Sequence, residues 1–370
     1  MKPQPPAPTN KPHHHVRTII LLLAVLVIAF VTRQYIAHYQ FEPAQDKTVR
    51  EPPHLHRFSV FGSYAQLTFW GAESVCKSAS REISSELQHL HERINLFDSE
   101  SELSRLNRTA AEELFVCSPR LWELFQASRK AYEVTDGAFD VTVGPLMKVW
   151  GFHGRRETLP SDRDISRALE SVGMEHIVFH EEKRAVTFTR AGTLVDFGGI
   201  AKGFGLDLAA EIAARHGIKR GLIDLGGNIY CLPTPPPGRE TYTVGIRNPL
   251  RPDSLIGAVK VLDRCIATSG SYEQYRVIDG QRFSHIVDPR TGQPVKTMAG
   301  VTVVTPAGVF SDAFSTAVFS AGADLAHRLR DRYQQTGILM ITLDEDGNPS
   351  VEKENWPWKV QLKPAKQESE

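Results

Sequence analysis

The chain has 370 residues, of which 41% are hydrophobic and 23% charged, a composition typical of a folded globular protein with room for one large domain or two lobes. Its 43 basic residues balance its 43 acidic residues, so the net charge gives no reason to expect nucleic acid or a strongly charged surface as a general partner.

The first distinctive segment is an uncharged apolar run within residues 18–36, which follows a polar and basic stretch, residues 1–17. Its length approaches the roughly 20 residues that cross a bilayer, so we predict an uncleaved signal anchor, with a cleaved signal peptide as the alternative. The basic residues before the run place the N-terminus in the cytoplasm. The sequence therefore predicts a protein of the bacterial cytoplasmic (inner) membrane, with residues 37–57 as a linker and the folded domain on the periplasmic side.

The folded domain is predicted over residues 58–360, followed by a polar tail, residues 361–370. Its periodicity alternates between strand-like and helix-like segments. Strands are predicted over 58–70, 300–305 and 337–343, a hairpin over 177–189, and helices around 83–94 and over 311–322, the last with Ser311 as its N-cap.

Residues 196–207, which read DFGGIAKGFGLD, join a short apolar run to a helical pattern. The two glycines near Asp196 allow the backbone to approach a ligand closely. Lys202 falls in the first turn of the predicted helix, where its charge adds to the partial positive charge of the helix N-terminus. This combination suits a phosphate group, although neither the Walker A nor the dinucleotide-binding pattern fits. An ordinary strand-to-helix turn with an exposed lysine is the alternative.

Three side chains that carry oxygen, Asp312, Ser315 and Thr316, stand at i, i+3 and i+4 in the segment SDAFSTA. This spacing places them on one face of a helix. Hard oxygen ligands of this kind suit Mg²⁺, which completes its shell with water and phosphate oxygens. A network that only caps the helix is the alternative.

His285 lies just before a tight turn at residues 288–292, in the segment SHIVDPRTGQPV. The proline and glycine of that turn fix the backbone, which would hold the imidazole in one place. A positioned histidine can act as a general base near neutral pH, whereas a hydrogen-bonded structural histidine is the alternative.

Six segments resemble, in one unbroken order, the successive motifs of the ApbE family, whose members are FAD:protein FMN transferases. The segments are FDVTVGPL (139–146), VDFGGIAKGFGLD (195–207), LIDLGGN (222–228), ATSGSYEQY (267–275), HIVDPRTGQPV (285–295) and SDAFSTA (311–317). The resemblance implies an α+β fold with two lobes, mixed or antiparallel sheets and flanking helices, and FAD in the cleft between the lobes.

The resemblance also implies a reaction and its participants. FMN would pass from FAD to a threonine or serine hydroxyl of a partner redox protein, an exported or membrane electron-transfer subunit, with release of AMP and with Mg²⁺ as the cofactor. His285 would be the catalytic base. The implied FAD contacts are Phe61, Phe97, Ala138, Phe139, Asp140, Asp196, Lys202 and Ile286. The implied Mg²⁺ ligands are the carbonyl of Gly199 and the side chains of Asp312, Ser315 and Thr316.

Two positions depart from the family pattern, because Phe61 replaces a common methionine and Phe97 a common tyrosine. Both keep an apolar or aromatic contact for a flavin ring. Asp140 has a turn or helix-capping role as its alternative. Two other functions stay open, an FAD pyrophosphatase that gives FMN and AMP and a non-catalytic exported FAD-binding protein. The oxygen set at the pyrophosphate argues against the second, because a carrier has no need of a metal there.

Overall fold

The computed structural model describes residues 52–154 and 156–362. The predicted anchor and the segment before it lie outside these residues, as do residues 37–51 of the linker and 363–370 of the tail. Within the described ranges, no helix is both long and apolar enough to cross a membrane. The described residues 52–154 and 156–362 belong to one compact unit, and the predicted division into two lobes with a cleft between them stays a prediction.

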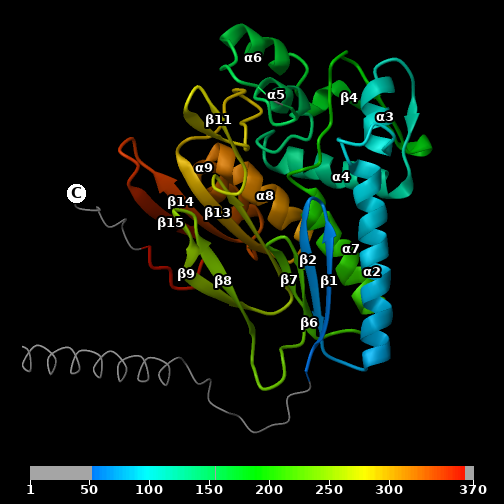
Figure 1. The fold of residues 1–370 in the computed structure, drawn as a ribbon, viewed down its shortest axis with the longest axis vertical. Helices are drawn as coiled ribbons and strands as arrows, with labels where there is room; N and C mark the ends of the chain where they lie inside the picture. Colours follow the sequence, from blue (N-terminus) through cyan, green and yellow to red (C-terminus); the bar gives the residue numbers. More distant parts are fainter. Residues whose placement is uncertain (1–51, 155, 363–370) are drawn as a thin grey trace, which may run out of the picture. The chain divides into compact units, whose positions relative to one another are not determined.

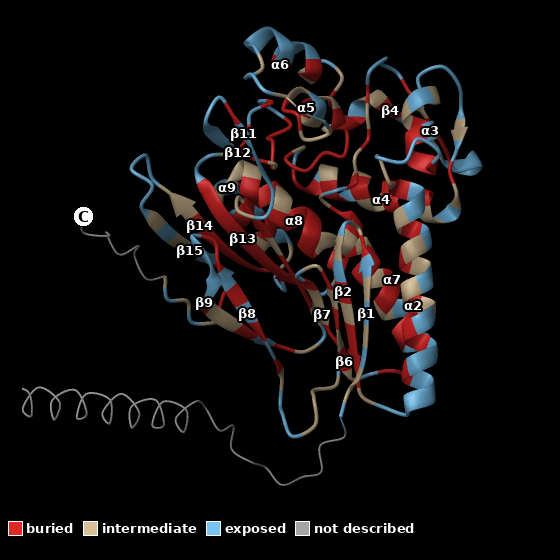
Figure 2. Ribbon diagram, in the orientation of Figure 1, coloured by how far each residue is buried: buried red, intermediate tan, exposed pale blue. Residues whose placement is uncertain are grey.

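An eight-stranded sheet forms the centre of the fold, and each pair of neighbouring strands in it is antiparallel. All eight residues of its strand β13 are buried, because helices cover one face of the sheet and a hairpin covers the other (Figure 2). Strands β13 and β14 confirm the strands predicted over 300–305 and 337–343. The spatial order is β1 (His54–Val60), β2 (Ser63–Phe69), β6 (Gly221–Leu225), β7 (Asn228–Cys231), β10 (Arg264–Gly270), β13 (Met298–Thr305), β14 (Gly337–Leu343) and β15 (Pro349–Glu354).

A two-residue turn, Phe61-Gly62, separates β1 from β2, where the sequence pattern predicted one strand over 58–70. The φ angles of Phe61 and Gly62 are 52° and 68°, the left-handed backbone that tight antiparallel hairpins require. Glycine reaches this region without steric cost, whereas a residue with a Cβ does so only when its surroundings hold it there. The single-strand prediction was therefore wrong, and the turn presents the Phe61 ring at the sheet edge.

Helices pack on one face of the sheet, namely α2 (Glu73–Ile94), α7 (Ala201–Arg215), α8 (Gly308–Ala321) and α9 (Ala323–Arg332) (Figure 1). Their apolar side chains meet alternate residues of β13, such as Val301 and Val303, in one buried cluster. On the opposite face, Ile266 and Val304 pack against the hairpin of β8 (Tyr242–Asn248) and β9 (Arg251–Val261). The period of two along each strand thus divides the core into two layers.

Helix α8 begins at Gly308, earlier than the start that Ser311 predicted. Ser311 lies inside the helix, and its hydroxyl donates to the carbonyl of Gly308 at 2.8 Å. Asp207 of α7 caps α8 instead, since its carboxylate accepts the backbone N–H groups of Gly308 at 2.6 Å and Val309 at 2.8 Å. A cap supplied by another helix leaves no local signal in the sequence, which explains the wrong assignment.

Smaller elements complete the domain (Figure 1). Antiparallel pairing of β4 with β5 confirms the hairpin predicted over 177–189. The β11–β12 hairpin packs with α5 and α6 around Trp150, Ile278 and Phe283. The α+β class with antiparallel sheets and flanking helices is confirmed. The bounds are α3 (Glu102–Thr109), β3 (Phe115–Val116), α4 (Pro119–Val134), α5 (Gly144–Val149), α6 (Asp162–Leu169), η1 (Met174–His176), β4 (Ile177–His180), η2 (Glu181–Lys183), β5 (Ala185–Phe188), β11 (Tyr275–Ile278) and β12 (Gln281–Ser284).

Candidate functional site

A cavity of about 1030 Å³ opens where the β1–β2 turn, the start of α7, helix α8, strand β8 and the segment after β12 come together. Its volume is at the upper end of the range of about 300–1,000 Å³ for small-molecule sites. Every residue predicted for the site lines it except Ser315. The predicted residues that line it are Phe61, Phe97, Ala138, Phe139, Asp140, Asp196, Gly199, Lys202, His285, Ile286, Asp312 and Thr316.

The turn that enters α7 is held by Asp196. One carboxylate oxygen, Oδ1, accepts the backbone N–H of Gly198 at 2.7 Å, and the other, Oδ2, lies 2.8 Å from Nε2 of His153. Lys202 follows in the first turn of the helix, as predicted. Its ammonium group lies near enough to His285 to lower the pKa of that imidazole. The cavity therefore has a positive charge at a helix N-terminus, which suits a phosphate.

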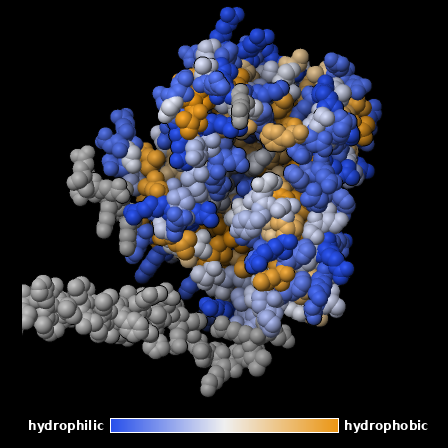
Figure 3. All heavy atoms as spheres, in the orientation of Figure 1, coloured by the Kyte–Doolittle hydropathy of each residue, from blue (hydrophilic) through white to orange (hydrophobic). Residues whose placement is uncertain are grey.

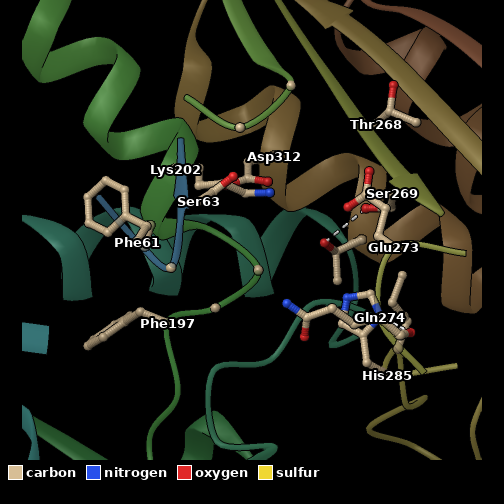
Figure 4. Close-up of a pocket in the computed structure, with 18 of the residues that line it drawn as sticks. Phe61, Ser63, Phe197, Lys202, Thr268, Ser269, Glu273, Gln274, His285 and Asp312 are labelled. Atoms are coloured by element: carbon tan, nitrogen blue, oxygen red, sulfur yellow. Dashed lines mark hydrogen bonds between the residues drawn. The ribbon is translucent and has the colours of Figure 1, made fainter. Parts of the chain in front are cut away.

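Helices α7 and α8 touch at Gly203. A Cβ at this position would lie 2.3 Å from the carbonyl oxygen of Gly308 and 2.6 Å from Cβ of Asp312, so only glycine fits there. The backbone N–H of Gly203 donates to Oδ2 of Asp312 at 2.8 Å. This contact fixes Asp312 beside Lys202 although the two residues are far apart in the sequence (Figure 4).

The hydroxyls predicted as metal ligands occupy different positions relative to the cavity. Thr316 lines the cavity and lies next to Gly199, where a Cβ would be 3.3 Å from the threonine oxygen. Ser315 is fully buried, and its hydroxyl donates to the carbonyl of Asp312 at 2.9 Å. Ser269 of β10 lies 2.8 Å from Oγ of Ser315 and 3.4 Å from Oγ1 of Thr316.

The predicted metal set has one carboxylate and otherwise neutral oxygens. Among residues 52–154 and 156–362, no group of three His, Cys, Asp or Glu side chains is placed to hold a metal ion. A site of the tetrahedral zinc type, built from thiolates and imidazoles, is therefore not offered by these residues. The oxygen set around Asp312 instead matches the preference of Mg²⁺ for a few protein oxygens.

His285 is held by the segment that precedes β11. Its Nδ1 lies 2.9 Å from the backbone carbonyl of Gln274 (Figure 4). A carbonyl can only accept a hydrogen bond, so Nδ1 carries the proton and Nε2 of the neutral ring keeps its lone pair. Burial lowers the pKa of His285 from 6.5, and the charge of Lys202 lowers it further. The imidazole is thus a neutral proton acceptor at physiological pH.

Aromatic rings line the cavity on the side of the β1–β2 turn. Phe97 is 79% exposed, and its ring meets that of His153 edge to face with centroids 6.1 Å apart. Phe61 meets His91 edge to face at 5.8 Å. The surface shown in Figure 3 is mostly hydrophilic, with hydrophobic side chains in separate groups. Phe97 is an exposed ring that lines the cavity, so it offers a contact for a planar ligand.

Asp140 occupies a buried position in the wall. Its Oδ1 accepts the backbone N–H of Thr142 at 2.8 Å and the hydroxyl of the same residue at 2.7 Å. Burial raises the pKa of Asp140 to about 6, although these hydrogen bonds lower it. The turn-forming role left open by the sequence is thus present, together with a position in the cavity wall beside Ala138 and Phe139.

Sequence reasoning missed several residues that contact the site. Ser269 and Glu273 stood in one family motif, and Asp207, which caps α8, stood in another, but none of them received a role; His153 gave no local signal. Partial removal from water raises the pKa of Glu273, although the charge of Lys202 lowers it; the charge of Asp312 is a smaller effect that raises it. A pattern of strand and turn residues does not show which of these polar groups face one cavity.

Comparisons with known proteins agree on one family. The sequence model of the ApbE family matches residues 61–340. The FAD:protein FMN transferase of Vibrio cholerae is 30% identical over 275 residues, which are 73% of this chain and 81% of the relative. The crystal structure of the ApbE protein from Thermotoga maritima is 29% identical, with a TM-score of 0.73 over 81% of this chain and 96% of that chain. The structure of the flavin transferase ApbE from Vibrio cholerae is 27% identical, with a TM-score of 0.70 over 82% and 97% of the two chains.

Proposed function

The chain belongs to the ApbE family and is an enzyme that transfers FMN from FAD to a protein; we propose that the acceptor is a threonine or serine hydroxyl, that AMP leaves, and that Mg²⁺ is required. The observation that carries the proposal is a single cavity that joins a cation at a helix N-terminus, Lys202, an oxygen set around Asp312, and His285 with a free ring nitrogen.

The FAD molecule would lie with its rings and its pyrophosphate against different walls. Phe61 and Phe97 offer aromatic contacts for the isoalloxazine ring. Lys202 and the start of α7 offer positive charge to the pyrophosphate. In phosphoryl transfer, positioning and charge neutralisation contribute most of the rate acceleration, so these two walls would supply much of the catalysis.

The donor set fits Mg²⁺. Asp312, Thr316 and the carbonyl of Gly199 would hold it, whereas Ser315, the fourth predicted ligand, does not line the cavity; the set contains oxygens alone and leaves room for water and phosphate. When bound, the cation supplies neutralisation of the charge that develops on the pyrophosphate. The N–H of Gly203 and the capped start of α8 keep the carboxylate of Asp312 in position for this purpose.

His285 would accept the proton of the acceptor hydroxyl. The hydroxyl oxygen forms a bond to the FMN phosphorus while the bond between that phosphorus and the bridging oxygen breaks. AMP leaves with the electron pair of the broken bond, and the hydroxyl proton passes to Nε2 of His285. The carbonyl of Gln274 orients the ring for this transfer by holding Nδ1–H.

We also propose where the reaction occurs and with which partner. The apolar run within residues 18–36 and the basic residues before it support a membrane anchor with the catalytic domain on the periplasmic side. An enzyme in that position would meet exported or membrane redox proteins, and the acceptor would be one of their electron-transfer subunits.

The test incubates the chain with FAD, Mg²⁺ and a redox domain that carries a candidate threonine, followed by intact mass and an AMP assay. We expect the acceptor to gain the mass of FMN in step with AMP release, and a chelator to stop both. AMP and free FMN without a gain in acceptor mass would indicate FAD hydrolysis. Binding of FAD without AMP would contradict enzymatic transfer.

A further inference from the structure

Three hydroxyl groups form a connected row between strand β10 and helix α8. Ser269 from the strand lies between Ser315 and Thr316 of the helix, at 2.8 Å from the first and 3.4 Å from the second. Ser315 is fully buried and does not line the cavity, whereas Ser269, which is 9% exposed, and Thr316 both line it. The row therefore runs from the protein interior to the wall beside Asp312.

The chemistry of the row fixes the direction of its protons. A hydroxyl carries one proton, and that of Ser315 is donated to the backbone carbonyl of Asp312, which can only accept. Ser269 must then be the donor in its contact with Ser315. With the proton of Ser269 committed, Thr316 is the donor in its contact with Ser269. The chain of donation is Thr316 to Ser269 to Ser315 to the carbonyl of Asp312.

One consequence concerns Thr316. Its proton is directed toward Ser269 of strand β10, so its oxygen lone pairs are left for its other neighbours in the wall, such as Gly199. The separation of 3.4 Å is longer than an ordinary hydroxyl pair, so this contact orients the proton more than it adds energy. A hydroxyl oxygen with its proton turned away is well arranged to bind a cation.

We propose that Ser269 is a positioning residue, which turns the proton of Thr316 toward strand β10 and thereby prepares its oxygen as a ligand for the divalent cation. The inference rests on the proposed cation site and adds a residue that acts through Thr316. It also gives Ser315 a task apart from the predicted ligand role, because the buried serine anchors the row on the carbonyl of Asp312. Partners that orient a metal ligand typically change metal affinity 10- to 100-fold when removed.

The experiment measures Mn²⁺ binding to the full chain by electron paramagnetic resonance, in the presence of ADP as a diphosphate that carries no flavin. We expect Ser269→Ala to weaken Mn²⁺ binding about tenfold, with FAD binding in the absence of a cation unchanged. Ser128→Ala is the matched control, because Ser128 is a buried serine whose hydroxyl only donates to Leu124 of its own helix. That control should bind Mn²⁺ like the unchanged chain.

A double substitution separates orientation from direct ligation. If the row acts as one unit, Ser315→Ala and Ser269→Ala each weaken Mn²⁺ binding by a similar factor, and the double variant is no weaker than either. If the losses of Mn²⁺ affinity multiply in the double variant, the row does not act as one unit and the proposal is overturned. Unchanged Mn²⁺ binding by Ser269→Ala would overturn it as well. Near-ultraviolet circular dichroism checks that each variant keeps its packing. Release of AMP by the unchanged chain without any divalent cation would contradict the proposed function instead.

Discussion

Replacement of Gly203 by alanine distinguishes two opposite expectations for the stability of the protein. Helix propensity alone predicts that Gly203→Ala stabilises α7 by about 1 kcal/mol, because alanine loses less backbone entropy than glycine. The structure predicts the reverse, since the new Cβ would lie 2.3 Å from the carbonyl oxygen of Gly308. That oxygen belongs to the backbone, so it cannot rotate aside and the two helices must separate.

The expected change in the free energy of unfolding of Gly203→Ala is the sum of three contributions. Overpacking costs about 1–3 kcal/mol, loss of the Gly203 hydrogen bond to the Asp312 carboxylate costs about 1.5–3 kcal/mol, and the propensity gain offsets about 1 kcal/mol. The net expectation is a loss of about 1.5–5 kcal/mol in the free energy of unfolding. Because the lost bond also holds Asp312, AMP release should fall together with stability.

Urea denaturation followed by tryptophan fluorescence measures the loss, since the chain has five tryptophans. The control is Ala214→Gly, at an exposed position of the same helix, which should lose about 1 kcal/mol through propensity alone. A Gly203→Ala protein as stable as the unchanged chain, or more so, would refute the argument from helix contact.

Three further predictions concern single side chains of the site. Asp312→Ala should lower cation-dependent AMP release at least about a hundredfold, because it removes the one carboxylate of the oxygen set. Asp324→Ala, at the exposed start of α9, is the control and should not lower it. If Asp312→Ala released AMP as fast as the unchanged chain, Asp312 would not be a cation ligand. Burial, and to a smaller extent the charge of Lys202, lowers the pKa of His285 from 6.5, so the loss of transfer in acid should be centred below pH 6.5 in a rate profile. Lys202→Met should move that loss to higher pH, and a profile that does not shift would contradict the charge effect. The pKa of Asp140 is raised from 3.8 to about 6, so its ionisation in the folded chain destabilises the protein as pH rises through that interval. Relative to Asp140→Asn, the unchanged chain should lose about 2–3 kcal/mol of unfolding free energy between pH 3 and pH 7, measured by urea titration. If the two proteins changed stability in parallel with pH, the carboxyl would not be buried.

Local patterns in the sequence predicted the elements that depend on nearby residues. The turn at Asp196 and the helix that starts next to Lys202 follow from glycine positions and helical spacing, which are properties of a few consecutive residues. The hairpin over 177–189 follows from alternation in the same way. The order of six motifs carried the family resemblance, and with it the set of residues that the cavity brings together.

Contacts between distant residues were decided only by the tertiary structure. The start of α8 was misassigned because its cap, Asp207, belongs to another helix. The long-strand assignment near residue 61 failed because a phenylalanine adopts a left-handed backbone that sequence preferences disfavour.

By itself, the sequence determined the types of residue available to the site and the local elements that carry them. The tertiary structure decided their relations: Ser315 is buried outside the cavity wall and hydrogen-bonded to Ser269, and the carbonyl of Gln274 selects the tautomer of His285. The physical reason is that hydrogen bonds between strand β10 and helix α8, or across a hairpin, depend on packing and register, which no short stretch of sequence encodes.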